Sequence, residues 1–158
     1  MAKGIHTIEL TTSPDQIWKF ISDINNWAPL VTGYVKHKII DDKHSTWRLH
    51  GDLGFIKRDV SLNVEIIEWQ IPNKISFTMA SPTKKLIGSG FFLAESTSPS
   101  TTKVTSQLEL RTTGKGAFVF NGAIIPFVPK MTKQLSKKVA DKFLRWFLWK
   151  LIINHFFF

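Results

Sequence analysis

The feature of this sequence that most constrains its fold is a long helical pattern near the C-terminus, preceded by a series of strand patterns. From Pro129 onward, apolar residues recur every three or four positions, at Met131, Leu135, Val139, Phe143 and Trp146. This spacing places all five on one face of a helix. Because most of the chain before residue 116 has strand patterns, we expect this face to pack against a sheet, in an α+β fold.

The sequence patterns before residue 116 predict one strand, two short helices and six further strands. Residues 5–12 alternate between apolar and polar, and Ser13-Pro14 is typical of a helix N-terminus, with Ser13 as the cap. A second short helical turn is expected near residues 27–31. From residue 34 to residue 110, short turns separate alternating runs, which is typical of an antiparallel meander. The sequence therefore predicts a curved seven-stranded antiparallel sheet.

The widths of these elements predict a space between sheet and helix. A helix is about 10 Å wide, whereas six or seven strands at about 4.8 Å spacing span about 30 Å. The sheet must therefore wrap around the helix. Such a wrap leaves room in the interior for an apolar ligand.

Composition and charge narrow the class of protein. The 158 residues are enough for one domain, and they include 13 Phe, 6 Trp and no Cys. The absence of Cys excludes disulfides and thiolate metal sites. The N-terminal residues show no apolar signal sequence, which predicts a cytoplasmic protein. Of the net charge of +9, residues 130–158 contribute +6, from seven Lys or Arg against one Asp.

The order of elements, the run Ser13-Pro14-Asp15-Gln16-Ile17-Trp18 and residues 116–144 resemble the SRPBCC, or START-like, superfamily. The resemblance covers roughly residues 4–148 and is nearest to the CoxG family, which is named after carbon monoxide dehydrogenase. It implies a helix-grip fold, with a hydrophobic, lipid-like molecule held under the C-terminal helix. Superfamily members include lipid-transfer domains, hormone binders and polyketide cyclases, so the fold alone leaves the function open. CoxG-type members also often end in a membrane-associating tail.

The cavity is expected to be lined by bulky residues from the inward strand faces and from the segment that leads into the helix. Pro126 and Pro129 are expected to prevent a regular helix through residues 118–128, so that this segment acts as a gate. The predicted ligand-binding residues are Trp27, His37, Trp47, Leu49, Leu62, Val64, Phe77, Met79, Phe92, Leu108, Phe118, Phe120, Ile124, Phe127, Met131 and Leu135.

The end of the chain predicts a second kind of contact. We expect residues 1–148 to form a single ligand-binding domain and residues 149–158 an apolar tail. From residue 143 the apolar residues surround the helix, and Lys150 lies among them, which favours contact with an anionic membrane surface at the inner face. Self-association into a homo-oligomer through the tail is one alternative, and packing of this segment on its own domain is another. The predicted membrane contacts are Trp146, Phe147, Trp149, Lys150, Phe156, Phe157 and Phe158.

The titratable side chains leave a catalytic function as an alternative to simple binding. The alternative to a binding protein is an enzyme of the polyketide cyclase/dehydratase type acting on an aromatic or polyketide substrate, with His37 as its acid or base. His37 and His6 each share a strand face with apolar residues, so they are expected to be either the polar groups of the pocket or satisfied core residues. The spacing of the candidate ligand residues predicts no metal site, and no cofactor is expected. No nucleic-acid motif is present, so nucleic acid is not an expected partner.

Overall fold

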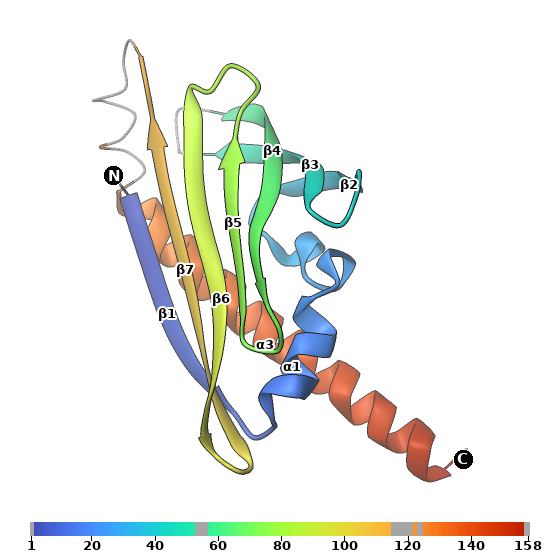
Figure 1. Cartoon of the computed structure of the whole chain (residues 1–158). Helices are drawn as coiled ribbons and strands as arrows, with labels where there is room; N and C mark the ends of the chain where they lie inside the picture. The colour runs from blue at the N-terminus through green and yellow to red at the C-terminus, as the bar shows by residue number, and fades with distance from the viewer. Residues whose placement is uncertain (1, 53–56, 115–121, 123–124, 157–158) are drawn as a thin grey trace.

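A curved antiparallel sheet and a long C-terminal helix make up most of the molecule (Figure 1). The computed structural model describes residues 2–52, 57–114, 122 and 125–156. Within these residues the sheet has seven strands in the order β1-β7-β6-β5-β4-β3-β2, and all neighbours are antiparallel. The predicted helix-grip architecture is confirmed. The strands are β1 (Ala2–Leu10), β2 (Tyr34–Ile39), β3 (His44–Asp52), β4 (Lys57–Gln70), β5 (Lys74–Ala80), β6 (Leu86–Ser98) and β7 (Thr101–Thr112).

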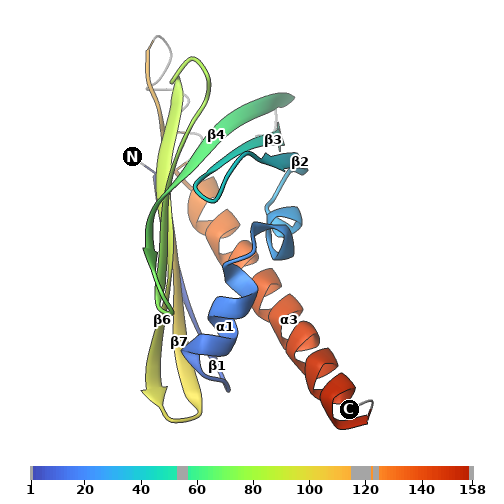
Figure 2. The ribbon, with the colours of Figure 1, turned by 45° about the vertical axis from the view of Figure 1, so that its right-hand side comes forward.

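Short helices connect the two edge strands β1 and β2. Helix α1 (Pro14–Ile21) begins with Pro14 after the extended Ser13, as the sequence predicts, but the Ser13 side chain makes no capping hydrogen bond. The α1 face that carries Ile17, Phe20 and Ile21 is buried. The 3₁₀ helices η1 (Ile24–Asn26) and η2 (Ala28–Leu30) then lead to β2. Figure 2 shows β2, β3 and β4 bending over towards these helices.

Helix α3 (Phe127–Phe156) crosses the concave face of the sheet (Figure 2). Its predicted stripe is buried or half-buried throughout. Pro129 does not prevent a regular helix, because it lies in the first turn, where backbone N–H groups have no partner within the helix. The expectation that the two prolines prevent a regular helix is therefore wrong for Phe127 and Val128, which are helical. The role of this segment as a gate stays a prediction, and residues 118–121, 123 and 124 lie outside the described residues. The helix also continues past residue 148, where we expected the tail to begin.

A second buried row on α3 has small and polar side chains, and it lets the helix approach β1 closely. The row comprises Val128, Thr132, Ser136 and Ala140. Across from it, a side chain at Gly4 would collide with Thr132 Oγ1 and would come within 2.8 Å of the Pro129 Cα atom. The helix is thus pressed against one edge of the sheet, and this placement leaves more space towards β3–β6.

Candidate ligand pocket

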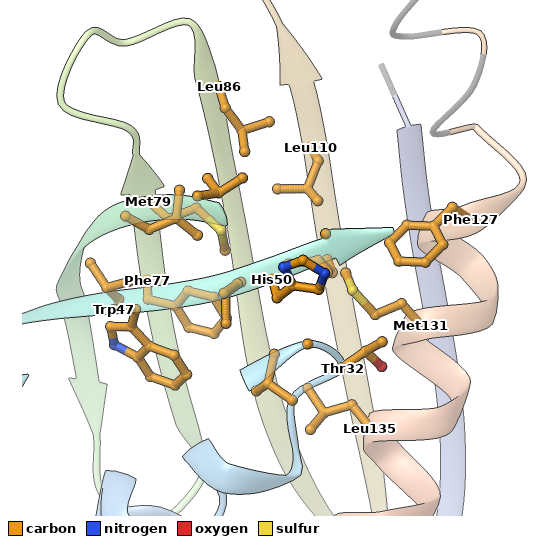
Figure 3. A pocket seen from close by; sticks show the side chains of 18 of the residues that line it. Thr32, Trp47, His50, Phe77, Met79, Leu86, Leu110, Phe127, Met131 and Leu135 are labelled. Carbon is orange, nitrogen blue, oxygen red and sulfur yellow. The ribbon is translucent and has the colours of Figure 1, made fainter. Parts of the chain in front are cut away.

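The space between α3 and strands β3–β7 contains a cavity of about 420 Å³. This volume is within the usual range for small-molecule sites. Figure 3 shows side chains from the sheet, the loop before β2 and α3 converging on it. Its lining is almost entirely apolar and consists of Trp27, Val31, Thr32, Gly33, Trp47, Leu49, His50, Gly51, Val60, Leu62, Val64, Phe77, Met79, Leu86, Leu108, Leu110, Phe127, Met131 and Leu135.

Most of the residues predicted to contact a ligand lie around this cavity. Phe118, Phe120 and Ile124 lie outside the described residues. Of the remaining predicted residues, only His37 and Phe92 do not border the cavity. The role of the bordering residues as ligand contacts stays a prediction. They are Trp27, Trp47, Leu49, Leu62, Val64, Phe77, Met79, Leu108, Phe127, Met131 and Leu135.

His37 lies on the edge strand β2 and does not border the cavity. It is paired with Trp47 of β3, which does border the cavity. Its Nε2 atom is 2.7 Å from Asn25 Oδ1 and its Nδ1 atom is 2.6 Å from the Tyr34 hydroxyl. Because the Asn25 oxygen can only accept, Nε2 donates to it and Nδ1 accepts from Tyr34. The imidazole also packs against the Trp47 ring, with centroids 5.6 Å apart. Both ring nitrogens are therefore engaged, and His37 does not reach the cavity.

Phe92 has the predicted inward direction but a deeper position. It is 3% exposed and packs against Trp27 and Phe77, with ring centroids 5.2 and 6.5 Å away. Those two residues border the cavity, and Phe92 supports them from behind.

The remaining lining residues were missed for different reasons. Val60, Leu86 and Leu110 share inward strand faces with predicted residues, so the alternation itself could have identified them. Val31, Thr32 and Gly33 lie in a loop, where no periodicity indicates direction. His50 and Gly51 border the cavity on β3, although the His50 ring is 53% exposed.

Two glycines on β6 shape the part of the sheet beneath the cavity. Gly90 is paired with Phe77 and Leu108, and Gly88 with Met79 and Leu110. A Cβ atom at Gly90 would lie 2.6 Å from the Phe77 ring, and one at Gly88 would lie 2.6 Å from Leu110 Cδ2. Because β6 has no side chains at these positions, those of β5 and β7 occupy the space above it.

Ionisable groups lie outside the cavity or at its margin. The His50 Nδ1–H donates to Asp59 Oδ1 over 2.7 Å, and Arg48 Nε lies 3.5 Å from Asp59 Oδ2. The hydrogen bond from His50, assisted by the charge of Arg48, lowers the pKa of the Asp59 carboxyl. Among the described lining residues His50 is the one ionisable side chain. The described residues contain no cluster of three potential metal ligands among His, Asp and Glu.

His6 lies at the contact between β1 and α3. Its Nδ1 atom is 2.8 Å from the Ser136 hydroxyl, and the residue is half-buried. Burial, together with the positive charges of Lys133 and Lys137, lowers the pKa of the His6 imidazole.

The predicted membrane contacts divide into packed and exposed residues. Trp146 and Phe147 pack on the core, and the Phe147 ring stacks on Phe143 with centroids 5.7 Å apart. Trp149 is 59% exposed, and Lys150 lies over the Trp146 ring at 4.1 Å. The side chain of Phe156, and Phe157 and Phe158 entirely, lie outside the described residues. In the described part of the chain, no helix combines the length and apolarity that a bilayer crossing requires.

A model of an uncharacterised protein family, whose description specifies no activity, matches residues 1–144. The chain belongs to that family. No curated protein matches the sequence at a significant level.

Solved structures with the same architecture match nearly the whole chain. A conserved protein from Geobacillus kaustophilus is 13% identical, with a TM-score of 0.70 over 90% of this chain and 95% of its own. Norcoclaurine synthase from Thalictrum flavum is 13% identical, with a TM-score of 0.62 over 90% and 94%. The aromatase/cyclase Zhui from Streptomyces sp. R1128 is 15% identical, with a TM-score of 0.52 over 89% and 85%. The chain therefore has the same helix-grip fold as these structures, and these identities support no closer statement.

Proposed function

We propose that this protein binds a hydrophobic, lipid-like small molecule in the cavity between the sheet and α3. The observation that carries the proposal is the cavity of about 420 Å³ with its nearly continuous apolar lining. Apolar surface around such a volume is stabilised by an apolar guest that removes it from water. The protein would carry or present its ligand, which is one of several uses found in the superfamily that the sequence resembles.

A cyclase-type enzyme is the alternative, and it needs an acid or base that reaches the substrate. The lining supports this alternative less well. His37 does not border the cavity, and the His50 ring is directed to Asp59. The aromatase/cyclase and norcoclaurine synthase among the similar structures keep the alternative relevant.

Filling the cavity tests the binding proposal. Leu135 borders the cavity from α3, so Leu135→Trp should reduce the volume available to a guest. The matched control is Leu144→Trp on the outer face of the same helix, where Leu144 is 41% exposed. We expect the neutral dye N-phenyl-1-naphthylamine to bind the wild type and the control, and to bind Leu135→Trp at least about 10-fold more weakly, because a clash in a packed site costs more than about 1.4 kcal/mol. Equal binding to all three proteins would place the dye elsewhere and contradict the proposal.

A second function, peripheral membrane association, is favoured by the outward face of α3. Along its first part this face carries exposed lysines, including Lys133 and Lys137. Further along, the same face carries exposed Leu148, Leu151 and Ile152. In both views the end of the helix projects away from the sheet (Figures 1 and 2). An apolar patch beside a basic one fits an anionic lipid surface, which would allow the ligand to be exchanged with a membrane.

Point substitutions test membrane association better than truncation, because a truncation before residue 143 would remove the buried Phe143. We compare Leu148→Glu/Ile152→Glu with the charge-matched control Ile40→Glu/Ile71→Glu; all four side chains are at least 45% exposed. The wild type and the control should co-sediment with phosphatidylcholine vesicles that contain phosphatidylserine. The helix variant should bind at least about 10-fold more weakly, since each inserted Leu or Ile contributes about 1.5–3 kcal/mol. If both double variants lose binding equally, overall charge is responsible and the helix end is not the contact.

A further inference from the structure

Among the described residues that line the pocket, one buried polar side-chain atom has no hydrogen-bond partner. Thr32 lies in the loop between η2 and β2 and borders the cavity. Figure 3 shows it beside Met131 and Leu135 of α3. Its Oγ1 atom is sealed from solvent and has no hydrogen-bond partner among the described residues. A buried hydroxyl without a partner destabilises the folded protein, so its presence here needs a reason.

The backbone around Thr32 is held firmly, so an irregular loop does not explain the unused hydroxyl. The His50 N–H donates to the Gly33 carbonyl over 2.6 Å, and the Tyr34 N–H donates to the Val31 carbonyl over 3.0 Å. Gly33 has a φ of +80°, and a Cβ atom there would collide with the His50 carbonyl oxygen. The remaining freedom of Thr32 is rotation about χ1, whose staggered positions lie about 120° apart.

The other buried side-chain donors of the lining already have partners within the protein. Trp27 Nε1–H donates to the Ile21 carbonyl over 2.9 Å, and Trp47 Nε1–H donates to the Ser45 hydroxyl over 2.8 Å. The His50 ring is bonded to Asp59 at the outer face. Among the described lining residues, Thr32 is thus the side chain with a buried group left for a guest.

We infer that Thr32 is the polar anchor of the pocket and that the ligand carries one uncharged hydroxyl or carbonyl group on an otherwise apolar body. In this structure Oγ1 has almost no accessible surface, in the cavity or outside it, so the inference requires a rotation about χ1 that turns Oγ1 towards the ligand group. A hydroxyl both donates and accepts, so either ligand group is matched. A charged group at this point would be desolvated, and His50, the one ionisable side chain of the described lining, is already hydrogen-bonded to Asp59. This inference rests on the proposed function and specifies the class of ligand.

The experiment measures whether the pocket distinguishes a hydroxyl from a methyl group of similar size. 2-Naphthol and 2-methylnaphthalene each compete with N-phenyl-1-naphthylamine for the wild type, Thr32→Val and Thr32→Ser. The control is Thr46→Val on β3, because Thr46 is half-buried and does not border the cavity. In Thr32→Val we expect the preference for 2-naphthol to fall about 5-fold, the range of one hydrogen bond. Thr32→Ser and Thr46→Val should keep the wild-type preference.

Stability supplies an independent readout for the same variants. Because Val replaces an unpartnered hydroxyl with a methyl group, the ligand-free Thr32→Val protein should melt at or above the wild-type temperature. An unchanged ligand preference in Thr32→Val would overturn the anchor while leaving the pocket in place. A lower melting temperature would assign the hydroxyl a structural role and would also overturn it. Failure of the wild type to bind the dye would instead contradict the proposed function itself.

Discussion

The same sheet and the same helix enclose two interiors of different character. In the packed half, Ile17, Phe20 and Phe143 are at most 2% exposed. Phe20 meets Phe143 and Trp146 edge-on, with ring centroids 5.7 and 5.5 Å apart. In the pocket half, strands β3–β7 and the first turns of α3 surround about 420 Å³. A shared fold therefore does not produce uniform packing.

The difference arises from what faces α3 at each level. In the packed half, α1 supplies aromatic and branched side chains between the sheet and the helix. In the pocket half the loop before β2 supplies Thr32 and Gly33, and β6 supplies Gly88 and Gly90, so little side-chain volume is available. Trp27 lies at the boundary, where it contacts Trp47 and Phe92. Trp27 also borders a second void, shared with Ile21, Trp69 and Ile75, of about 10 Å³, which has room for at most one water molecule.

Matched truncations of phenylalanine should show the largest effect. Phe143→Ala removes a ring that is enclosed on all sides and should lower the free energy of unfolding by about 3–5 kcal/mol. Phe77→Ala removes a half-buried ring that already borders the cavity, and it should cost about 1–2 kcal/mol. Urea unfolding of both variants provides the measurement. Equal losses would mean that the two halves are packed equally well in solution.

The close contact between β1 and α3 should be the next most sensitive feature. Gly4→Ala places a methyl group against Thr132 and Pro129, and we expect a loss of about 1–3 kcal/mol. Thr132→Ala removes the nearer obstacle, so the double variant should be more stable than the sum of the single effects predicts. Thermal or urea unfolding of the four proteins tests this coupling. Strict additivity would show that helix and strand are not in contact at this point.

Adding one methylene group should then change the stability in opposite directions in the two halves. Val60 borders the cavity, so Val60→Ile can extend into available space and should stabilise the protein by about 0.5–1 kcal/mol. Val139 is 7% exposed in the packed half, and Val139→Ile should destabilise it by about 1 kcal/mol or more. Dye binding adds a second readout, because Val60→Ile should also weaken binding. The contrast fails if both variants shift stability in the same direction.

The alternation of residues along each strand predicted the walls of the pocket well, because it determines which side chains point to the concave face of the sheet. Alternation on β4, β5 and β7 placed Leu62, Phe77 and Leu108 on one face, and all three border the cavity. Periodicity does not determine depth along a strand. Phe92 faces inward as predicted, but it lies at a level where Trp27 and Phe77 cover it.

The features that sequence patterns could not supply depend on contacts between distant segments. β2 has a register shift between Tyr34 and Lys36, and His37 lies at the sheet edge, where Asn25 from η1 binds it. The direction of Thr32 depends on the bond between Gly33 and His50, residues that no local pattern connects. The continuation of α3 past residue 148 follows from its apolar composition, but nothing in that composition distinguishes the packed Phe147 from the exposed Leu148.

The smallest predicted effect is a pH dependence of stability that arises at the contact between β1 and α3. The pKa of His6 is lower in the folded protein than its ordinary value of 6.5, chiefly because of burial and then because of Lys133 and Lys137. Protonation therefore favours the unfolded chain: the contribution of neutral His6 is complete above pH 6.5 and is lost as the pH falls towards the folded pKa. His6→Gln should remove this part of the pH dependence of urea unfolding, whereas Ser136→Ala, which keeps the imidazole, should retain it. If the free energies of unfolding of the wild type and His6→Gln depend on pH in the same way just below pH 6.5, the imidazole is solvated in both the folded and the unfolded state. The contact between β1 and α3 at His6 would then be less tightly packed than the packed half.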